Sequence, residues 1–331
     1  MTFPEASRQE PERGFRASRR IEPRRIRVEA SSFCQLRCPS CPTTSGHIYP
    51  AIGSGFLKLE NFRELVESNP ALEHVELSNY GEVFLNPQLL QIFEYAHQRD
   101  VAISIRNGAN LNHVQDEVLE GLVKFRVHSL SCSIDGATTE SYRQYRVRGD
   151  FDTVIRNIER INFYKRRNQS QLPSLIWQFV VFGHNEREIP LAREMAEKRG
   201  MEFCTKLSWD ETFSPIRDRA FVRAQTGWQS MTRDEYEQEH DEKFGTAICH
   251  QLWDAPQINW DGKVIGCCRN FWGDFGGNAL TDGLMDSINS EKMTYAREML
   301  SGRMPPRNDI PCSTCEIYVA MRNRSKFIVK D

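Results

Sequence analysis

Three cysteines on one short segment have a spacing that suits an iron–sulfur cluster. Cys34, Cys38 and Cys41 form a C-x3-C-x2-C pattern. Three thiolates on one loop can hold three corners of a cubane cluster, because soft thiolates suit iron–sulfur centres. No fourth cysteine lies nearby, so one iron would stay open for a substrate or cofactor. A structural zinc site normally needs four protein ligands, and His47 as the fourth keeps zinc as an alternative.

A second set of cysteines near the C-terminus could close a complete metal site. Cys249, Cys267, Cys312 and Cys315 have the pattern C-x17-C-x44-C-x2-C. Residues 253–266 predict a β-hairpin with Asp261-Gly262 at its turn, which would bring the first two thiols together. Four thiolates then bind an iron–sulfur cluster or a zinc ion. Cys268 competes with Cys267 as ligand, because neighbouring strand residues point to opposite faces.

Alternating apolar runs and amphipathic stretches must position these loops. Strand-like and helix-like segments alternate five times and end on a sixth strand, which predicts a parallel sheet with helices outside it. Right-handed crossovers would curl this sheet into a partial (β/α)6 TIM-like barrel, whose ligands sit at the carboxyl ends of the strands. The expected strands are Ile26–Ala30, His74–Ser78, Ala102–Arg106, Ser129–Ile134, Leu175–Phe182 and Phe203–Leu207. The expected helices are Leu57–Glu67, Pro87–Gln98, Gln115–Lys124, Phe151–Arg166 and Glu186–Arg199.

The remaining segments complete a four-part division of the chain. Residues 1–25 are rich in Arg, Glu, Pro and Ser and predict a flexible leader. The barrel is expected over 26–210, a charged linker over 211–245, and a small domain of hairpin and helices over 246–331. Eight arginines between Arg8 and Arg27 suggest a nucleic-acid arm, but the interleaved glutamates favour a solvated tail.

Bulk composition narrows the class of protein. The 331 residues are 39% hydrophobic, with 43 basic against 45 acidic side chains and a mean hydropathy of −0.57. These values fit a soluble globular protein, and the total charge demands neither nucleic acid nor an anionic membrane. No apolar run approaches the length of about 20 residues that spans a bilayer. With no secretory signal, ten cysteines indicate the reducing cytoplasm and metal binding rather than disulfides.

The first cysteine loop, placed directly after the first expected strand, resembles the radical SAM superfamily. The resemblance implies that Cys34, Cys38 and Cys41 bind a [4Fe–4S] cluster whose open iron takes S-adenosylmethionine. A low-potential cluster, reaching about −700 mV, reduces the sulfonium of the cofactor. The 5′-deoxyadenosyl radical that results abstracts hydrogen from a C–H bond of the substrate. An external one-electron reductant such as flavodoxin or ferredoxin is implied as well.

Residues at the ends of the next strands match further elements of that family. Gly81 and Glu82 resemble the second half of a Gly-Gly-Glu element that holds the methionine amino group, with Tyr80 in place of the first glycine. Asn107 precedes a glycine at the end of the third strand, as in the family's Thr-Asn-Gly. The resemblance implies that Ser133 contacts the ribose and Arg146 the carboxylate of the cofactor. Spacing alone leaves Arg143 and Arg148 as alternatives to Arg146.

The C-terminal cysteines resemble the twitch domain, a shortened relative of the SPASM domain. The resemblance implies one auxiliary [4Fe–4S] cluster held by Cys249, Cys267, Cys312 and Cys315. Cys132, Cys204 and Cys268 then have no cluster role, and a buried, inert thiol is the ordinary interpretation. A sharper alternative comes from radical epimerases, in which a thiol returns a hydrogen atom to the substrate. Cys204 and Cys268 are the candidates, because both could face the space between the barrel and the C-terminal domain.

The resemblance leaves the reaction open. We expect hydrogen abstraction from a small polar substrate of sugar or amino-cyclitol type, giving oxidation or epimerisation. Trp209, Asp210, Glu211 and Arg217 could line the substrate pocket or form a solvated linker. Two alternatives remain: a maturase that modifies a ribosomal peptide or protein, and a non-enzymatic scaffold with two zinc sites.

Overall fold

The chain forms one curved sheet with helices packed against its outer face. A computed structural model describes residues 20–245 and 248–328, so most of the expected leader lies outside the described residues. The six barrel strands are β1 (Arg25–Val28), β2 (His74–Glu76), β3 (Ala102–Ala109), β4 (Ser129–Ser133), β5 (Ser174–Val181) and β6 (Met201–Leu207). All neighbouring pairs from β1 to β6 are parallel. The expected partial barrel of six strands is confirmed.

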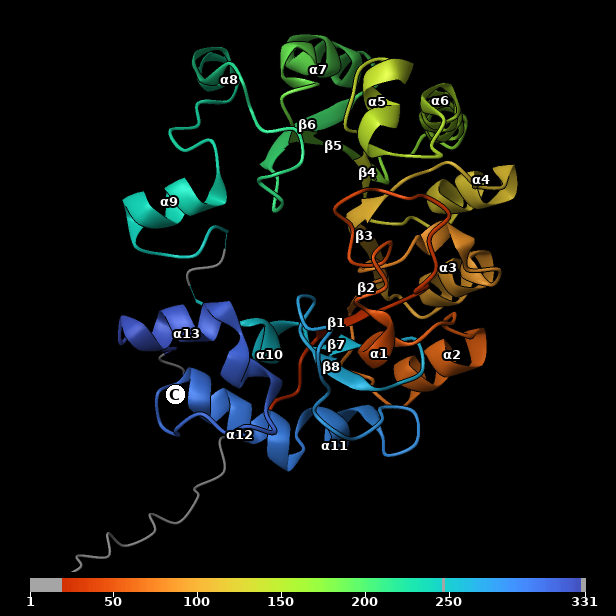
Figure 1. The fold of residues 1–331 in the computed structure, drawn as a ribbon. Coiled ribbons are helices and arrows are strands. Elements are labelled where there is room, and N and C mark those ends of the chain that lie inside the picture. Colours follow the sequence, from red (N-terminus) through yellow and green to blue (C-terminus); the bar gives the residue numbers. More distant parts are fainter. Residues whose placement is uncertain (1–19, 246–247, 329–331) are drawn as a thin grey trace, which may run out of the picture.

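Helices α2, α3, α4, α6 and α7 follow the strands and line the outside of the arc (Figure 1). α6 shows why these segments are helical. Asp150 caps its first turn by accepting from the Thr153 amide at 2.7 Å, and the buried face carries Val154, Ile158 and Ile161 at helical spacing. The connecting helices are α2 (Leu59–Glu67), α3 (Leu89–Gln98), α4 (Asp116–Lys124), α5 (Thr139–Tyr145), α6 (Phe151–Arg167) and α7 (Ile189–Lys198), with 3₁₀ turns η1 (Val83–Leu85) and η2 (Glu186–Glu188).

The C-terminal hairpin continues the sheet of the barrel. Strands β7 (Gln257–Ile258) and β8 (Val264–Gly266) pair antiparallel, and β7 also pairs parallel with β1, joining Arg27 to Gln257. The strand order is therefore β6-β5-β4-β3-β2-β1-β7-β8. The expected hairpin is present, with Gly262 at a φ of 88° in its loop and its amide donating to Asn259 at 3.0 Å.

The chain forms further, mostly short helices beside these. Two of them, α8 (Arg219–Thr226) and α9 (Arg233–His240), lie in the segment 211–245, which was expected to be loop-like. Each begins at a capping side chain, since Asp218 accepts from Phe221 and Thr232 accepts from Glu235. The other helical segments are α1 (Tyr49–Ile52), α10 (Gln251–Asp254), α11 (Leu284–Ile288), α12 (Glu291–Leu300), η3 (Pro311–Thr314) and α13 (Glu316–Asn323). Of the helices described, none is long and apolar enough to cross a bilayer.

Candidate functional site

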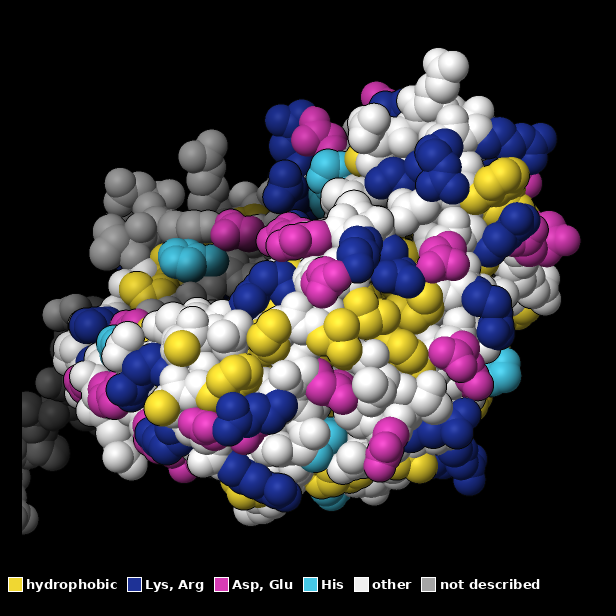
Figure 2. All heavy atoms as spheres, turned by 90° about the horizontal axis from the view of Figure 1, so that it is seen from above, with side chains coloured by type: hydrophobic (Ala, Val, Ile, Leu, Met, Phe, Trp, Pro, Cys, Tyr) yellow, Lys and Arg dark blue, Asp and Glu magenta, His cyan; other side chains and the backbone are white. Residues whose placement is uncertain are grey.

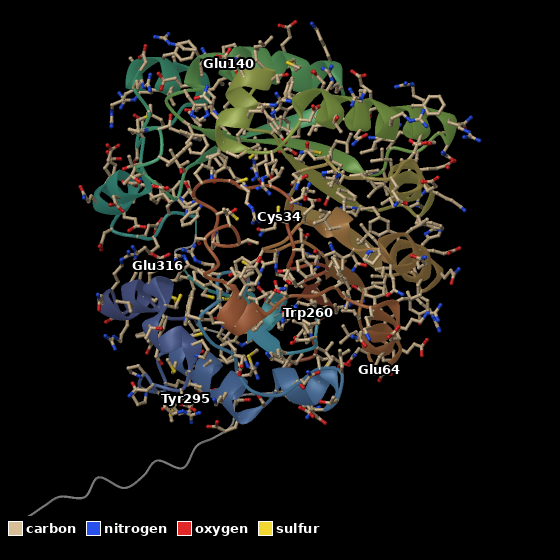
Figure 3. The ribbon with its side chains drawn as sticks, turned by 45° about the vertical axis from the view of Figure 1, so that its right-hand side comes forward. Cys34, Glu64, Glu140, Trp260, Tyr295 and Glu316 are labelled. Carbon is tan, nitrogen blue, oxygen red and sulfur yellow. The ribbon has the colours of Figure 1, made fainter. Side chains whose placement is uncertain are left out.

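A pocket of about 700 Å³ opens at the carboxyl ends of the barrel strands. Its walls come from the first cysteine loop, the ends of β2 to β6, α9, and the C-terminal domain. Figure 3 places Cys34 near the centre of the molecule, whereas Glu64 and Glu140 lie at its periphery. A parallel sheet offers its ligand site at this edge. The pocket therefore lies where the sequence predicts it.

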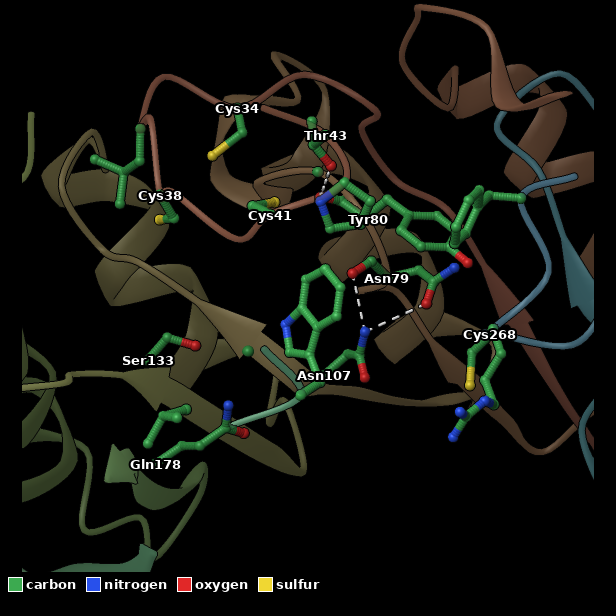
Figure 4. A pocket seen from close by; sticks show the side chains of 18 of the residues that line it. Cys34, Cys38, Cys41, Thr43, Asn79, Tyr80, Asn107, Ser133, Gln178 and Cys268 are labelled. Atoms are coloured by element: carbon green, nitrogen blue, oxygen red, sulfur yellow. Dashed lines mark hydrogen bonds between the residues drawn. The ribbon is translucent and has the colours of Figure 1, made fainter. Parts of the chain in front are cut away.

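The three cysteines of the first loop all line this pocket. They lie near one another at one end of it, away from Cys268 (Figure 4). The loop is fixed by backbone bonds, since the Arg37 amide donates to Val147 at 3.0 Å and the Cys41 amide donates to Cys38 at 3.1 Å. Burial, assisted by the nearby Glu82 carboxyl, raises the pKa of Cys34 to about 12.

Two polar side chains point at the sulfurs of this loop. Asn110 Nδ2 lies 3.8 Å from the Cys34 sulfur, and Arg146 Nη1 lies 3.8 Å from the Cys38 sulfur. Donors at these positions stabilise negative charge on sulfur, which is what thiolate ligands carry. His47, the alternative fourth ligand, is instead exposed, and its Nδ1 lies 2.9 Å from the Ser45 hydroxyl.

The turn at Gly81 packs directly beneath the cysteine loop. A Cβ on Gly81 would lie 1.9 Å from the Ser31 carbonyl oxygen, so the backbone can approach this closely only at glycine. Glu29, buried at the end of β1, accepts from the Tyr80 amide at 2.9 Å and the Gly81 amide at 3.3 Å. This side chain fixes the turn, and no motif in the sequence indicates its role.

Glu82 lines the pocket as a buried carboxyl. It accepts from the Asn110 amide at 2.7 Å and from the Phe84 amide at 3.2 Å. Burial nevertheless outweighs these hydrogen bonds and raises its pKa to about 7. A cationic group entering the pocket would favour the ionised form, as expected of a partner for an ammonium.

Asn107, Ser133 and Arg146 also line the pocket. Asn107 Nδ2 donates to the Asn79 carbonyl oxygen at 2.9 Å (Figure 4). Ser133 is buried beside Gly108, where a Cβ would lie 2.3 Å from the serine hydroxyl. The glycine therefore leaves the hydroxyl room at the floor of the pocket.

Arg146 is the arginine of the three candidates that reaches the pocket. Its Nε donates to Asp135 at 2.6 Å, and the side chain of Asp135 is fully buried. Arg143 instead donates to the carboxylate of Asp150 at the surface, and Arg148 is not among the residues that line the pocket. Asp135 belongs to a strand-end motif visible in the sequence, but only the fold reveals its pairing with Arg146.

The four C-terminal cysteines assigned together line one small cavity. Cys249, Cys267, Cys312 and Cys315 surround it with Leu252, Tyr318 and other apolar side chains. Cys268 faces the other way, into the large pocket, and its thiol donates to Gln251 Oε1 at 3.2 Å. The two adjacent cysteines therefore point in opposite directions as expected, although they lie in the turn just after β8 and not in the strand itself.

Cys204 and Cys132 lie elsewhere. The half-buried Cys204 on β6 lies 3.9 Å from the Thr205 carbonyl oxygen and is not among the residues that line the large pocket. This differs from the expectation that it faces the space beside the C-terminal domain, because it lies three residues before the end of β6. Cys132 is fully buried in the core of the sheet.

Several polar residues of the pocket were not singled out from the sequence. Lys206 on β6, Gln178 on β5, Arg233 on α9 and the Arg269–Glu316 pair all line it. Side-chain alternation along β6 predicts that Lys206 faces the inside of the barrel. Whether it reaches the pocket depends on where the strand ends, which the sequence pattern does not define. Of the four loop residues expected there, Trp209 lines the pocket, whereas Asp210 is bonded to Ser40 at 2.6 Å. Glu211 and Arg217 are not among its lining residues.

The two groups of cysteine thiols suit iron–sulfur clusters better than single metal ions. Within residues 20–245 and 248–328, no three His, Cys, Asp or Glu side chains converge closely enough to bind one metal ion. The thiols instead surround two spaces, one with three sulfurs beside an open pocket and one with four in an enclosed cavity. Three thiols beside a pocket leave a metal accessible, whereas four thiols do not.

Known family models match the two segments that carry these groups of cysteines. A family model described as the radical SAM superfamily matches residues 28–196, and one described as an iron–sulfur cluster-binding domain, SPASM, matches residues 249–316. An AdoMet-dependent heme synthase from Methanosarcina barkeri (strain Fusaro) is 26% identical over 139 residues, which are 41% of this chain. The match spans 38% of the length of that relative.

Solved structures share the fold at low sequence identity. SuiB from Streptococcus suis, bound to S-adenosylmethionine, superposes with a TM-score of 0.60 at 12% identity, over 89% of this chain and 71% of SuiB. BtrN, in complex with AdoMet and 2-DOIA, gives 0.51 at 15% identity over 89% and 93% of the two chains. The structure of anSMEcpe with bound AdoMet and Cp18Cys peptide superposes with a TM-score of 0.55 at 15% identity. The match covers 88% of this chain and 86% of anSMEcpe.

Proposed function

The chain belongs to the radical SAM superfamily, and we propose that it abstracts hydrogen from a C–H bond of a small polar substrate of sugar or amino-cyclitol type. It uses S-adenosylmethionine with a [4Fe–4S] cluster, and its SPASM domain carries an auxiliary cluster. When bound and reduced by an external donor, this cofactor pair supplies a 5′-deoxyadenosyl radical as the oxidant. The protein orients the cofactor and the substrate and excludes water from the pocket.

The residues of the large pocket divide into holders of the cluster and holders of the cofactor. Cys34, Cys38 and Cys41 would ligate the first cluster, because they are the thiols that line this pocket at one end. Glu82 would receive the methionine ammonium, and Arg146 the methionine carboxylate. The other cofactor contacts would come from Gly81, Asn107 and Ser133, which line the same pocket.

The auxiliary cluster would be held by Cys249, Cys267, Cys312 and Cys315, which line one cavity. The opposite orientation of Cys268 supports Cys267 as the ligand of the adjacent pair. A flavodoxin or ferredoxin would deliver the electron. A scaffold with two zinc sites is set aside, because radical SAM proteins are enzymes.

One observation carries the choice of reaction. Cys268 presents a thiol to the same pocket as the three cysteines of the first loop. We infer epimerisation, in which a substrate radical takes the hydrogen atom of this thiol and forms a C–H bond on the opposite face. The sulfur radical that remains is restored to a thiol by one electron from the external donor and one proton. Oxidation is the alternative, with the substrate radical losing a proton and an electron, the latter passing to the auxiliary cluster.

The dimensions and lining of the pocket favour a small ring-shaped substrate. Small-molecule sites commonly measure about 300–1,000 Å³, and the cofactor shares the 700 Å³ here with the substrate. Trp209 and Trp272 line the pocket with 53% and 44% of their surfaces exposed, so each offers a flat apolar face to a ring. A ribosomal peptide or protein is the alternative substrate.

Anaerobic incubation tests the proposal. The reconstituted enzyme is mixed with dithionite, S-adenosylmethionine and a panel of sugars, amino-cyclitols and short peptides, and 5′-deoxyadenosine is measured. A sugar that raises its formation and yields an isomer of equal mass supports epimerisation. A product two hydrogens lighter identifies oxidation, and stimulation by peptides alone contradicts the proposed substrate class.

A further inference from the structure

Besides Arg146, three cations from three separate elements line the large pocket. Lys206 comes from the end of β6, Arg233 from the first turn of α9, and Arg269 from the segment after β8. Arg269 is paired with Glu316 of α13, which Lys243 also approaches at 3.7 Å. The charge of this arginine is therefore already balanced by protein.

The other two cations lack such a partner. In the part of the chain that the structure describes, neither Lys206 nor Arg233 has a carboxylate oxygen within 4.0 Å. Lys206 donates to the Gln178 amide oxygen at 2.6 Å. Arg233 donates to the Leu207 carbonyl oxygen at 3.3 Å and lies over the Phe244 ring at 5.2 Å, while its buried Nε has no hydrogen-bond partner among the described residues.

The acidic groups near these cations act on them from a distance, without direct pairing: Glu211, Glu237 and Glu316 act on Arg233, and Asp135 acts on Lys206. Glu82 is held by backbone amides at the far end, beside the cysteine loop, and Glu316 is already shared between Arg269 and Lys243. By contrast, basic and acidic side chains are interspersed on the outer face shown in Figure 2. Cations without a directly paired carboxylate in a partly enclosed pocket raise the local concentration of anions.

The cofactor accounts for one anionic group only. Its carboxylate is proposed to meet Arg146, so the cofactor brings no further anion to Lys206 and Arg233. A guanidinium and an ammonium on one pocket wall suit an oxyanion, because the arginine fork and the lysine point charge donate to different oxygens. An amino-cyclitol, itself a cation, would add to the positive charge.

We propose that Lys206 and Arg233 bind an oxyanion of the substrate, a phosphate ester or a carboxylate. Resting on the proposed function, this narrows the substrate to an acidic or phosphorylated sugar and removes amino-cyclitols. Trp209 would stack on the ring while the two cations hold its charged group. Anchoring the charged group in this way would determine which carbon of the ring is oxidised or inverted.

Binding to the anaerobic, cluster-loaded protein saturated with S-adenosylmethionine tests this inference without turnover. Isothermal titration calorimetry measures Kd for glucose 6-phosphate, glucuronate, glucose and glucosamine, and Kd for S-adenosylmethionine is measured separately. Either or both acidic sugars should bind at least about tenfold more tightly than glucose and glucosamine, which is a difference of about 1.4 kcal/mol. Preference between the two distinguishes a phosphate from a carboxylate.

Variants assign the binding to the two cations. Lys206→Gln and Arg233→Gln should each weaken binding of the acidic sugar about tenfold, Arg233→Lys should restore part of it, and the exposed Arg166→Gln on α6 should have no effect. Iron content and melting temperature report folding. The inference is overturned if the acidic sugars bind no better than glucose, or if the variants weaken S-adenosylmethionine binding instead. If no sugar stimulates 5′-deoxyadenosine formation while anion binding persists, the proposed function fails and the anion site stands.

Discussion

Asp135 holds Arg146 by a 2.6 Å hydrogen bond to Nε, and this pairing directs the other end of the guanidinium to within 3.8 Å of the Cys38 sulfur. A residue at the end of β4 thereby sets the charge beside a proposed cluster ligand. Because the side chain of Asp135 is fully buried, water cannot take the place of the arginine as its partner.

Asp135→Asn should therefore destabilise the protein strongly. Removing one partner of a buried ion pair leaves the other charge uncompensated, at a typical loss of about 3–5 kcal/mol. Urea unfolding under anaerobic conditions measures the loss, and the midpoint potential of the first cluster should shift because Arg146 is released. Glu159→Gln is the matched control, since Glu159 pairs with Arg199 at 3.0 Å but is more than half exposed. A loss below about 1 kcal/mol, as at such a surface pair, would contradict the role of Asp135.

Gly81→Ala should disrupt the first cluster. The new Cβ would meet the Ser31 carbonyl oxygen at 1.9 Å and the Phe33 carbonyl oxygen at 2.8 Å, so the segment leading into Cys34 has to move. We expect a loss of at least about 2 kcal/mol together with a smaller iron content. Gly200→Ala is the control, because its φ is also positive, at 63°, and no described atom lies within 4 Å of its Cβ position. Its cost should stay at about 1 kcal/mol, with the iron content unchanged.

Iron analysis distinguishes the two adjacent cysteines of the hairpin. The reconstituted protein should hold about eight irons per chain in two clusters. Cys267→Ser should reduce this to about four, because it removes a thiol from the enclosed cavity, whereas Cys268→Ser should leave about eight. The reverse pattern would assign the auxiliary site to Cys268 and would end its proposed role as hydrogen donor.

Deuterated buffer examines that role directly. A thiol exchanges with solvent, so the wild-type isomer should carry deuterium at the inverted carbon. Cys268→Ala should abolish the isomer while 5′-deoxyadenosine still forms, because abstraction does not need this thiol. Cys204→Ala should behave as wild type, since Cys204 is not among the residues that line the pocket. Isomer with solvent deuterium from the Cys268 variant would exclude Cys268 as the donor.

His74 should make the protein less stable in mild acid. Burial, then the charges of Arg25, His128 and Arg106, lower its pKa from 6.5 to about 4, so the folded state keeps the ring neutral. The unfolded state binds the proton first, and the stabilising contribution present above pH 6.5 is lost between pH 6.5 and 4. Partial exposure reduces the effect to about 1 kcal/mol, or about 2 °C in melting temperature.

His74→Gln should show a smaller fall in melting temperature between pH 7.5 and pH 4.5 than wild type, because glutamine does not titrate. The exposed His47→Gln should follow the wild-type curve. Equal falls for all three proteins would show that His74 does not govern this pH range.

The spacing of apolar residues along the sequence predicted the barrel, because each of its strands and longer helices carries the pattern typical of its own type. The expected strand Ser129–Ile134 and helix Phe151–Arg166 differ from β4 and α6 by one residue at one end. Short helices such as α5 were missed, since seven residues with a Thr138 cap carry little periodic signal. The pairing of β1 with β7 was not predictable either, because two residues of β7 join a strand far away in the sequence.

The cysteine ligands were predictable from spacing, whereas the polar lining of the pocket was not. Arg146 could be named from a family motif, but the arginines at 143 and 148 were separated from it only by the fold. Arg233 lies on a short helix in a segment expected to be loop-like, and its approach to Lys206 depends on how that segment crosses the open side of the barrel.

The seam between β1 and β7 has a consequence for synthesis of the chain. Val28 emerges from the ribosome about 230 residues before its partner Ile258, which at about 5–20 residues per second is a delay of roughly 10–50 seconds. During this interval the edge of the first strand, immediately before the cysteine loop, has no neighbour on that side and can pair with other nascent chains. Expression should therefore benefit from slow growth at low temperature, and fragments that stop short of the hairpin should aggregate.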